Sequence, residues 1–307
     1  MRIECERLAN GGRLDWNNGD SGGRHEAAVA QVILGRGRGC VLQCRARAAT
    51  ILIPLRGRLQ IADGESTRML PRGQLWVAEG GQRFQAIGRG SALWIAVLAS
   101  AAAWRGLIES DPCAADPLLL PALHAADAGV RRAGVDVART TLGSHVDPNA
   151  DLALLMLALR IAELQSGFAP LIERCAGRTL AQRRSVFLRL QRVRNYMTSC
   201  CHLDLDIAGF ARMASYSSCH FIRAFSAVYG ETPHAVLVEQ RLERARRLLD
   251  DSAMAITEIA RASGFENRCA FARSFKRHFG LSATDLREAG RAAGGLTSHH
   301  ARVRVAV

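Results

Sequence analysis

Two arginines occupy matching places in a repeated pattern and have the chemistry to bind nucleic acid. Arg273 lies between Phe271 and Phe275, and Arg223 has the same place in an earlier copy. Phenylalanines four residues apart share one face of a helix, so an arginine between them points away from that face. A guanidinium group donates paired hydrogen bonds to guanine or to phosphate oxygens. Both arginines are therefore candidates for contacts with nucleic acid.

The two copies have the pattern of a helix, a tight turn and a second helix. The first is Ile207–Gly230, IAGFARMASYSSCHFIRAFSAVYG, and the second is Ile256–Gly280, ITEIARASGFENRCAFARSFKRHFG. Asp206 is a predicted N-cap, and Gly264 suits a turn with positive φ, where Ser215 is its counterpart. One copy alone would favour an ordinary helical bundle. Two copies, each with an outward arginine, favour helix-turn-helix units whose second helices enter the major groove.

A long helix is predicted between the copies, over Pro233–Asp251. Proline suits its first turn. It has an apolar stripe at helical spacing, formed by Leu237, Leu242, Ala245, Leu248 and Leu249. Roughly 17 residues of helix span about 25 Å at ~1.5 Å per residue. With the width of the packed helices added, this length suits a spacer between recognition helices about 34 Å apart on DNA. A plain core helix would show the same stripe.

These segments resemble the DNA-binding domain of the AraC/XylS-type transcription regulators. The resemblance covers about residues 190–287 and rests on RLERARRLLDDS, ITEIARASGF and FARSFKRHFGLSATDLR. It implies an all-helical domain with two helix-turn-helix units that bind adjacent major grooves of a promoter. It also implies a set of DNA-contacting residues. These are Ser218, Cys219, His220, Ile222, Arg223, Asn267, Arg268, Cys269, Ala270, Arg273, Lys276 and Arg277.

Several of these positions are poor in hydrogen-bonding groups. Where the family usually has a polar or aromatic pair before the phenylalanine, this chain has Cys269 and Ala270. Cys269, Ala270, Cys219 and Ile222 can contact thymine methyl groups or fill space. Phosphate contacts and DNA shape are therefore expected to contribute much of the binding, which should fall steeply with salt. The predicted phosphate contacts are Arg268, Lys276 and Arg277.

Composition agrees with a polyanionic partner. The formal net charge is +13, which favours nucleic acid through counterion release. Nine cysteines occur without a CxxC pair, so zinc ribbons and redox dithiols are not indicated. The vicinal pair Cys200-Cys201 could sense oxidants or thiol-reactive metals, but buried or loop thiols are the preferred interpretation. The cysteine content, the absence of a signal-peptide pattern, and apolar runs too short to cross a bilayer (Ala92–Trp104, Leu152–Ile161) predict a cytoplasmic protein.

The N-terminal half has the pattern of short strands. Between Gly39 and Ala99, apolar runs alternate with glycine turns, which is typical of an antiparallel barrel or sandwich. The segments LRGRLQIADG and LPRGQLWVAEGG resemble the cupin-like sensor barrel that often precedes this DNA-binding domain. The fold class is therefore α+β, an N-terminal antiparallel cupin-like barrel followed by an all-α domain. Gly11–Arg24 is expected to be loop.

The expected organisation has four parts. They are a sensor domain at 1–110, a helical connector at 111–190, the double helix-turn-helix domain at 191–290 and a flexible tail at 291–307. In the connector, Asp151–Gln165 is apolar nearly all round and should be buried on more than one side, at or near a homodimer interface. A helix over Ala181–Met197 should place Leu190, Val193 and Met197 inward.

The predicted barrel is not expected to hold a metal or a cofactor. No histidine lies between His25 and His124, and metal-dependent cupins need several histidines and a carboxylate around one ion. An apolar effector pocket remains a hypothesis, with Trp76, Phe84 and Trp94 as its walls. For each of these rings taken singly, a place in the structural core is the preferred interpretation.

The favoured function is a sequence-specific DNA-binding transcriptional regulator, most simply an activator, and not an enzyme. Its expected partners are double-stranded DNA, an unknown small-molecule effector, a second copy of the chain and RNA polymerase, with no membrane. The alternative is a DNA-binding module fused to a thiol-based sensor or a repair-type enzyme domain. A repair alkyltransferase would need a zinc-ligating cysteine cluster or a PCHR-like segment, and neither is present. A helical adaptor that binds proteins is a third class.

Overall fold

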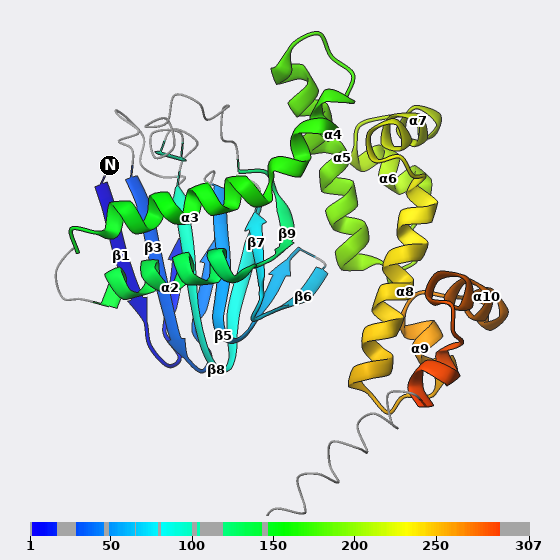
Figure 1. Ribbon diagram of the computed structural model, residues 1–307, viewed down its shortest axis with the longest axis horizontal. Coiled ribbons are helices and arrows are strands. Elements are labelled where there is room, and N and C mark those ends of the chain that lie inside the picture. Colours follow the sequence, from blue (N-terminus) through cyan, green and yellow to red (C-terminus); the bar gives the residue numbers. More distant parts are fainter. Residues whose placement is uncertain are drawn as a thin grey trace, which may run out of the picture. The chain divides into compact units, whose positions relative to one another are not determined.

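The protein is described by a computed structural model over residues 2–288, except 17–28, 46–48, 65, 79–80, 100–102, 105–118 and 143–146. It divides into two compact units, residues 1–191 and 192–307 (Figure 1). The tail expected at 291–307 lies outside the described residues. The first unit combines strands with helices and the second is helical, which confirms the α+β class.

One mixed sheet forms most of the first unit. Its strands are β1 (Arg2–Leu8), β2 (Arg13–Trp16), β3 (Val29–Gly37), β4 (Val41–Cys44), β5 (Ala49–Asp63), β6 (Ser66–Pro71), β7 (Gln74–Ala78), β8 (Phe84–Ala99) and β9 (Ala122–Ala125). The main order is β1-β3-β8-β5-β7-β9, with β6 beside β5, β4 beside β8 and β2 beside β4. Among the described strands no pairing closes the sheet, so a barrel is not confirmed.

The pairing differs from the expected antiparallel sheet in two places. β1 pairs with β3, and β2 with β4, in parallel. β2 also lies inside Gly11–Arg24, which had been expected to be loop, so that expectation was wrong for residues 13–16. Its RLDW sequence lacks a continuous apolar run, and its pairing with β4 supplies the hydrogen bonds that order it.

Side-chain alternation explains why β5 and β8 are central. In β5, Ile51 and Ile53 enter the hydrophobic cluster beneath the helices, whereas Leu52 enters a second cluster on the opposite face. Leu59, from the other half of β5, joins that second cluster. Because both halves contribute to one cluster, the sheet must curve around it. Gly57 makes the bend: its φ is +72°, and a Cβ there would lie 3.1 Å from the backbone of Ala92 in β8.

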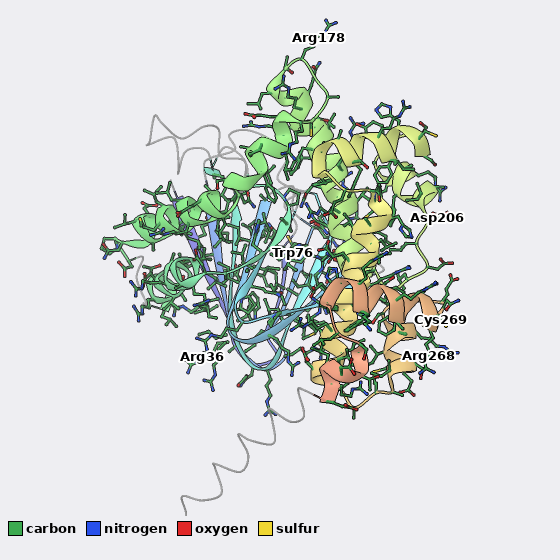
Figure 2. All side chains as sticks on the ribbon, turned by 45° about the vertical axis from the view of Figure 1, so that its right-hand side comes forward. Arg36, Trp76, Arg178, Asp206, Arg268 and Cys269 are labelled. Atoms are coloured by element: carbon green, nitrogen blue, oxygen red, sulfur yellow. The ribbon has the colours of Figure 1, made fainter. Side chains whose placement is uncertain are left out.

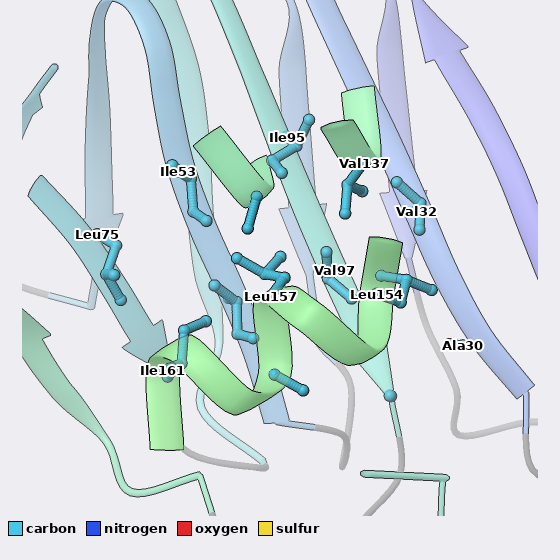
Figure 3. Close-up of a cluster of buried hydrophobic side chains, with 14 of the residues drawn as sticks. Ala30, Val32, Ile53, Leu75, Ile95, Val97, Val137, Leu154, Leu157 and Ile161 are labelled. Carbon is cyan, nitrogen blue, oxygen red and sulfur yellow. The ribbon is translucent and has the colours of Figure 1, made fainter. Parts of the chain in front are cut away.

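Two helices, α2 (Ala128–Leu142) and α3 (Ala150–Leu164), cover one face of the sheet (Figures 1 and 3). Leu154, Leu157 and Ile161 of α3 are buried against that face. The opposite side of α3 is not buried, since Leu152 and Met156 are 57% and 43% exposed. The sequence predicted that this helix would be buried on more than one side. Within one copy of the chain that prediction was wrong, because α3 is buried only on the side that faces the sheet.

The segment that follows α3 includes a short 3-10 turn, η1 (Ser166–Phe168), and α4 (Ala169–Glu173). By length and composition alone, Ala150–Glu173 would be long and apolar enough to cross a membrane. In this fold Leu154, Leu157 and Ile161 of α3 contribute to the core between the sheet and the helices.

The next helix, α5 (Leu180–Cys200), runs from the first unit into the second. Leu190, Val193 and Met197 are fully buried, as predicted. The remaining helices are α6 (Ile207–Met213), α7 (Ser218–Tyr229), α8 (Pro233–Asp251), α9 (Ile256–Ala262) and α10 (Arg268–Phe279). The bounds of α8 confirm the predicted long helix, which Thr232 caps through a hydrogen bond from the Ala235 N–H.

Within the second unit, α6 and α7 pack near one end of α8, and α9 and α10 pack near the other (Figures 1 and 2). In the second copy, Phe271 and Phe275 pack with Leu242, Ala245 and Leu249 of α8. The apolar stripe predicted for α8 is thus the surface that carries the second helix pair.

Candidate nucleic-acid interface

The two helix pairs have the same turn geometry. Ser215 has a φ of +60° and Gly264 a φ of +90°. The Tyr216 N–H donates to the Ala211 carbonyl at 2.8 Å, and the Phe265 N–H donates to the equivalent Ala260 carbonyl at 3.0 Å. Equivalent backbone bonds at equivalent positions confirm that both copies are helix-turn-helix units.

Each second helix begins with a side-chain cap. The Ser217 hydroxyl accepts a hydrogen bond from the His220 N–H at 3.4 Å. Asn267 Oδ1 accepts from the N–H groups of Cys269 and Ala270, at 2.7 and 3.2 Å. The carbonyl of Asn267 is therefore used by the helix, and only its amide NH₂ remains for a contact with DNA. Asp206 caps α6 by accepting from the Gly209 N–H at 2.7 Å, as predicted.

The buried faces of α7 and α10 are also alike. Ring centroids are 5.5 Å apart for Phe221 and Phe225, and 5.4 Å apart for Phe271 and Phe275. All four phenylalanines are fully buried. Because these rings determine how each helix is rotated, Arg223 and Arg273, which lie between them in sequence, face outward.

All of the predicted contact residues lie at the start or on the surface of α7 and α10, and all but one are exposed. Arg268 and Cys269 lie at the outer edge of the second unit in Figure 2. Ala270 is the exception, since it is half-buried. Ala272, which the sequence analysis did not include, is exposed and has the place in α10 that Ile222 has in α7. The spacing of the repeat was the signal that could have identified it.

Two predicted residues have partners within the unit. The His220 ring stacks on Tyr216 with centroids 4.6 Å apart, which orients the imidazole beside the turn. The Arg223 Nε–H donates to the Cys219 carbonyl at 3.4 Å. That bond is long and exposed, so the guanidinium can exchange it for a phosphate or a base without a large cost.

The last turn of α10 is basic. It contains Lys276, Arg277 and His278. His278 Nε2 lies 3.7 Å from a carboxylate oxygen of Glu243 in α8. Lys276 and Arg277 are exposed. Their positive charges stabilise the carbonyl end of the helix, and they also attract a polyanion such as DNA.

The vicinal thiols lie in the core of this unit. Cys200 and Cys201 are both buried, as the preferred interpretation expected. Burial raises the pKa of Cys201, against the opposing effect of Arg244, Arg247 and Arg241. Because the thiolate is the reactive form, a buried thiol with a raised pKa is poorly suited to a sensor.

The three proposed pocket walls lie inside the curved sheet. Trp76, Phe84 and Trp94 are buried in one cluster, with Trp76 and Phe84 edge to face at 5.0 Å. Arg68, paired with Asp63 at 2.6 Å, lies over the Trp76 ring. A hollow of about 260 Å³ borders Phe84, and a groove of about 670 Å³ follows α2 and α3. Within the described ranges no three His, Cys, Asp or Glu side chains are grouped as metal ligands.

Comparison with known proteins agrees with this geometry. Residues 210–289 match the family described as "Helix-turn-helix domain". The MmsAB operon regulatory protein of Pseudomonas aeruginosa is 29% identical over 101 residues, which are 33% of this chain and 33% of that protein. The transcriptional regulator ExsA of the same organism is 27% identical over 250 residues, which are 78% of this chain and 85% of ExsA.

The second unit is an AraC-type helix-turn-helix domain. A probable AraC family regulator from Rhodopseudomonas palustris is similar to 33% of this chain, over 96% of its own, at 24% identity and a TM-score of 0.32. The matched region spans about a third of the MmsAB regulator's length, whereas the match to ExsA extends from the AraC-type domain into the first unit.

Proposed function

We propose that the chain is a cytoplasmic transcriptional activator that binds double-stranded DNA through α7 and α10. The observation that supports this most strongly is the pair of equivalent helix-turn-helix units at opposite ends of α8. With 19 residues, α8 is about 28 Å long at ~1.5 Å per residue. Together with the width of the packed helices, this length suits major grooves about 34 Å apart on one face of the duplex.

The exposed side chains suggest a division of roles. Arg223 and Arg273 are proposed as base-edge or phosphate contacts. Arg268, Lys276 and Arg277 are proposed as phosphate contacts. Cys219, Ile222, Cys269 and Ala270, which offer little hydrogen bonding, are proposed to pack against thymine methyl groups, and Ser218, His220 and the Asn267 amide to donate to the backbone. A complex of this kind depends strongly on salt.

The first unit is proposed to be the regulatory part. Its curved sheet encloses Trp76, Phe84 and Trp94, and the hollow of about 260 Å³ beside Phe84 is proposed as the place where a small molecule binds, in the manner of a cupin-like sensor. The exposed apolar side of α3, with Leu152 and Met156, is proposed as the homodimer interface. An effector can alter DNA binding only if it favours one arrangement of the dimer over another. RNA polymerase would be the partner of an activator.

No catalytic activity is proposed. The relatives are named as regulatory proteins, and the structure supports DNA binding through side chains that need no reaction. The domain limits 1–110, 111–190 and 191–290 remain part of the proposal.

The test is binding of the purified chain to duplex DNA from its own upstream region. Footprinting should show two protected segments about one helical turn apart, and affinity should fall steeply as salt rises. Arg273→Ala should weaken binding. Arg36→Ala, which removes the same charge from an exposed site in the first unit, should not. A nearly flat salt dependence, or equal effects of the two substitutions, would contradict the proposal.

A further inference from the structure

Both helix-turn-helix units lie in the second compact unit, and they touch each other away from α8. The turn of the second helix-turn-helix unit contacts the residues that lead into α6, the first helix of the other one. A Cβ added to Gly264 would lie 2.7 Å from the Cys201 carbonyl oxygen and 3.1 Å from the His202 Cα. Cys201 and His202 lie between the end of α5 and the start of α6. The two units are therefore joined by direct backbone contact as well as by α8.

Two arginines of α8 bind carbonyl groups on both sides of this contact. Arg241 donates from Nε to the Cys201 carbonyl at 2.8 Å and from Nη2 to the Leu203 carbonyl at 3.1 Å. Arg244, one turn further along, donates from Nε to the Ala262 carbonyl at 2.9 Å. Carbonyl groups at the ends of helices lack helical partners and prefer cationic donors.

The arrangement requires a glycine at position 264. The added Cβ would also lie 2.8 Å from Arg241 Nε, and the φ of +90° disfavours any other residue. Ser263, next to it, is fully buried. The guanidinium of Arg241, the carbonyl of Cys201 and the backbone of Gly264 thus meet at one place, near the middle of α8.

We propose that Arg241, Arg244 and Gly264, together called the junction, fix the orientation of α7 relative to α10 and so determine which spacing of half-sites the protein accepts. This deepens the proposed function and rests on it. α8 alone would allow its two ends to bend and twist. The junction adds a second attachment between the two helix-turn-helix units, so the second recognition helix is already aligned when the first one binds.

One test measures orientation without DNA. Cys219 and Cys269 are exposed at equivalent positions of α7 and α10. With Cys5→Ser and Cys113→Ser in the full chain, spin labels on these two cysteines report the distance between the helices. The expected distribution is narrow in this parent and clearly broader after Arg241→Ala. Arg247→Ala removes the same charge from an exposed site on α8 and should leave it narrow. Distance distributions of equal width in the parent, Arg241→Ala and Arg247→Ala would contradict the proposed role of the junction.

A second test measures the functional consequence. The full chain is first used to enrich a duplex from a random pool. One to five base pairs are then inserted between the two half-sites, which are the groove contacted by α7 and the groove contacted by α10. The chain should lose about tenfold or more in affinity away from its preferred spacing, because the second helix then leaves its groove. Arg241→Ala and Gly264→Ala should bind the preferred site more weakly, tolerate insertions better and bind single half-sites unchanged.

The outcomes separate the two proposals. Failure of the full chain to enrich any duplex overturns the proposed function, while the spin-label result still decides the junction. Binding by the full chain, with an unchanged spacing profile in Arg241→Ala, overturns the junction alone. If Gly264→Ala does not fold, Arg241→Lys replaces it. Lysine keeps the charge but cannot donate to both carbonyls in one plane, so a broadened profile is again expected.

Discussion

Ser215 and Gly264 occupy the same place in the two helix-turn-helix turns, and both have positive φ angles, +60° and +90°. Among the described residues Ser215 is the only non-glycine in this region. The difference follows from their surroundings: Ser215 is exposed, so its side chain has room, whereas the backbone of Gly264 lies against Cys201 and Arg241. The same turn therefore tolerates a side chain in the first helix-turn-helix unit, at Ser215, and does not tolerate one in the second, at Gly264.

Ser215→Gly should stabilise the second unit by about 0.5–1 kcal/mol, because a left-handed conformation costs a non-glycine residue roughly 1 kcal/mol or more. Gly264→Ser should destabilise it by clearly more than this gain, through both φ and contact. Urea denaturation followed by far-UV circular dichroism measures both. The idea fails if the two substitutions change stability by similar small amounts.

Arg223→Ala and Arg273→Ala should each reduce operator affinity by roughly 1–3 kcal/mol, since each removes a bidentate donor from an exposed helix face. Lys276→Ala should weaken binding to all sequences alike and lower the salt slope by about one. Fluorescence anisotropy at several salt concentrations distinguishes the two behaviours. Unchanged affinity of a well-folded Arg273→Ala protein would contradict the assignment.

Asn267 offers a way to separate helix capping from DNA contact. Asn267→Ala should cost about 1 kcal/mol of stability, because the N–H groups of Cys269 and Ala270 lose their acceptor. Asn267→Asp keeps the cap and should preserve stability, but its negative charge near phosphates should weaken DNA binding. Thermal unfolding and a binding titration measure the two effects. Equal stability losses in both variants would refute the capping role.

His124 should make the first unit less stable in acid. Burial lowers the pKa of His124, and Gln165 Nε2, 3.1 Å away, donates to its ring nitrogen. The folded state thus favours the neutral ring. Because the unfolded pKa is near 6.5, this stability is full above about pH 6.5 and falls as pH drops towards the folded pKa.

The measurement is the free energy of unfolding between pH 5 and 8. His124→Leu should reduce the fall in stability at low pH, whereas His234→Ala, at an exposed histidine of the second unit, should not. A pH profile of His124→Leu identical to that of the original chain would exclude the contribution.

Leu152→Glu with Met156→Glu should produce monomers, because the two charges would lie on the apolar side of α3 that the proposed dimer buries. Leu281→Glu, at an exposed leucine of the second unit, is the control and should remain dimeric. Sedimentation velocity gives the mass in each case. A dimer that survives the double substitution would place the interface elsewhere.

The sequence by itself determined the second unit in some detail. The spacing of Phe271 and Phe275, the cap at Asp206 and the proline at the start of α8 act through hydrogen bonds and contacts within a few residues. For this reason the bounds of α8, the turns and the outward direction of the two arginines were predicted correctly. The repeat added what a single copy lacked, since it showed that the same local signals occur twice.

Only the tertiary structure decided the rest. The parallel pairing of β1 with β3 and of β2 with β4 depends on partners distant in sequence, and so does the bend at Gly57. The local sequence of a strand does not indicate which other strand its backbone will bond to. The same is true of the contact between Gly264 and Cys201. An isolated glycine in a turn predicts a positive φ, but the backbone that approaches it is selected by the packing of α8 against both helix pairs.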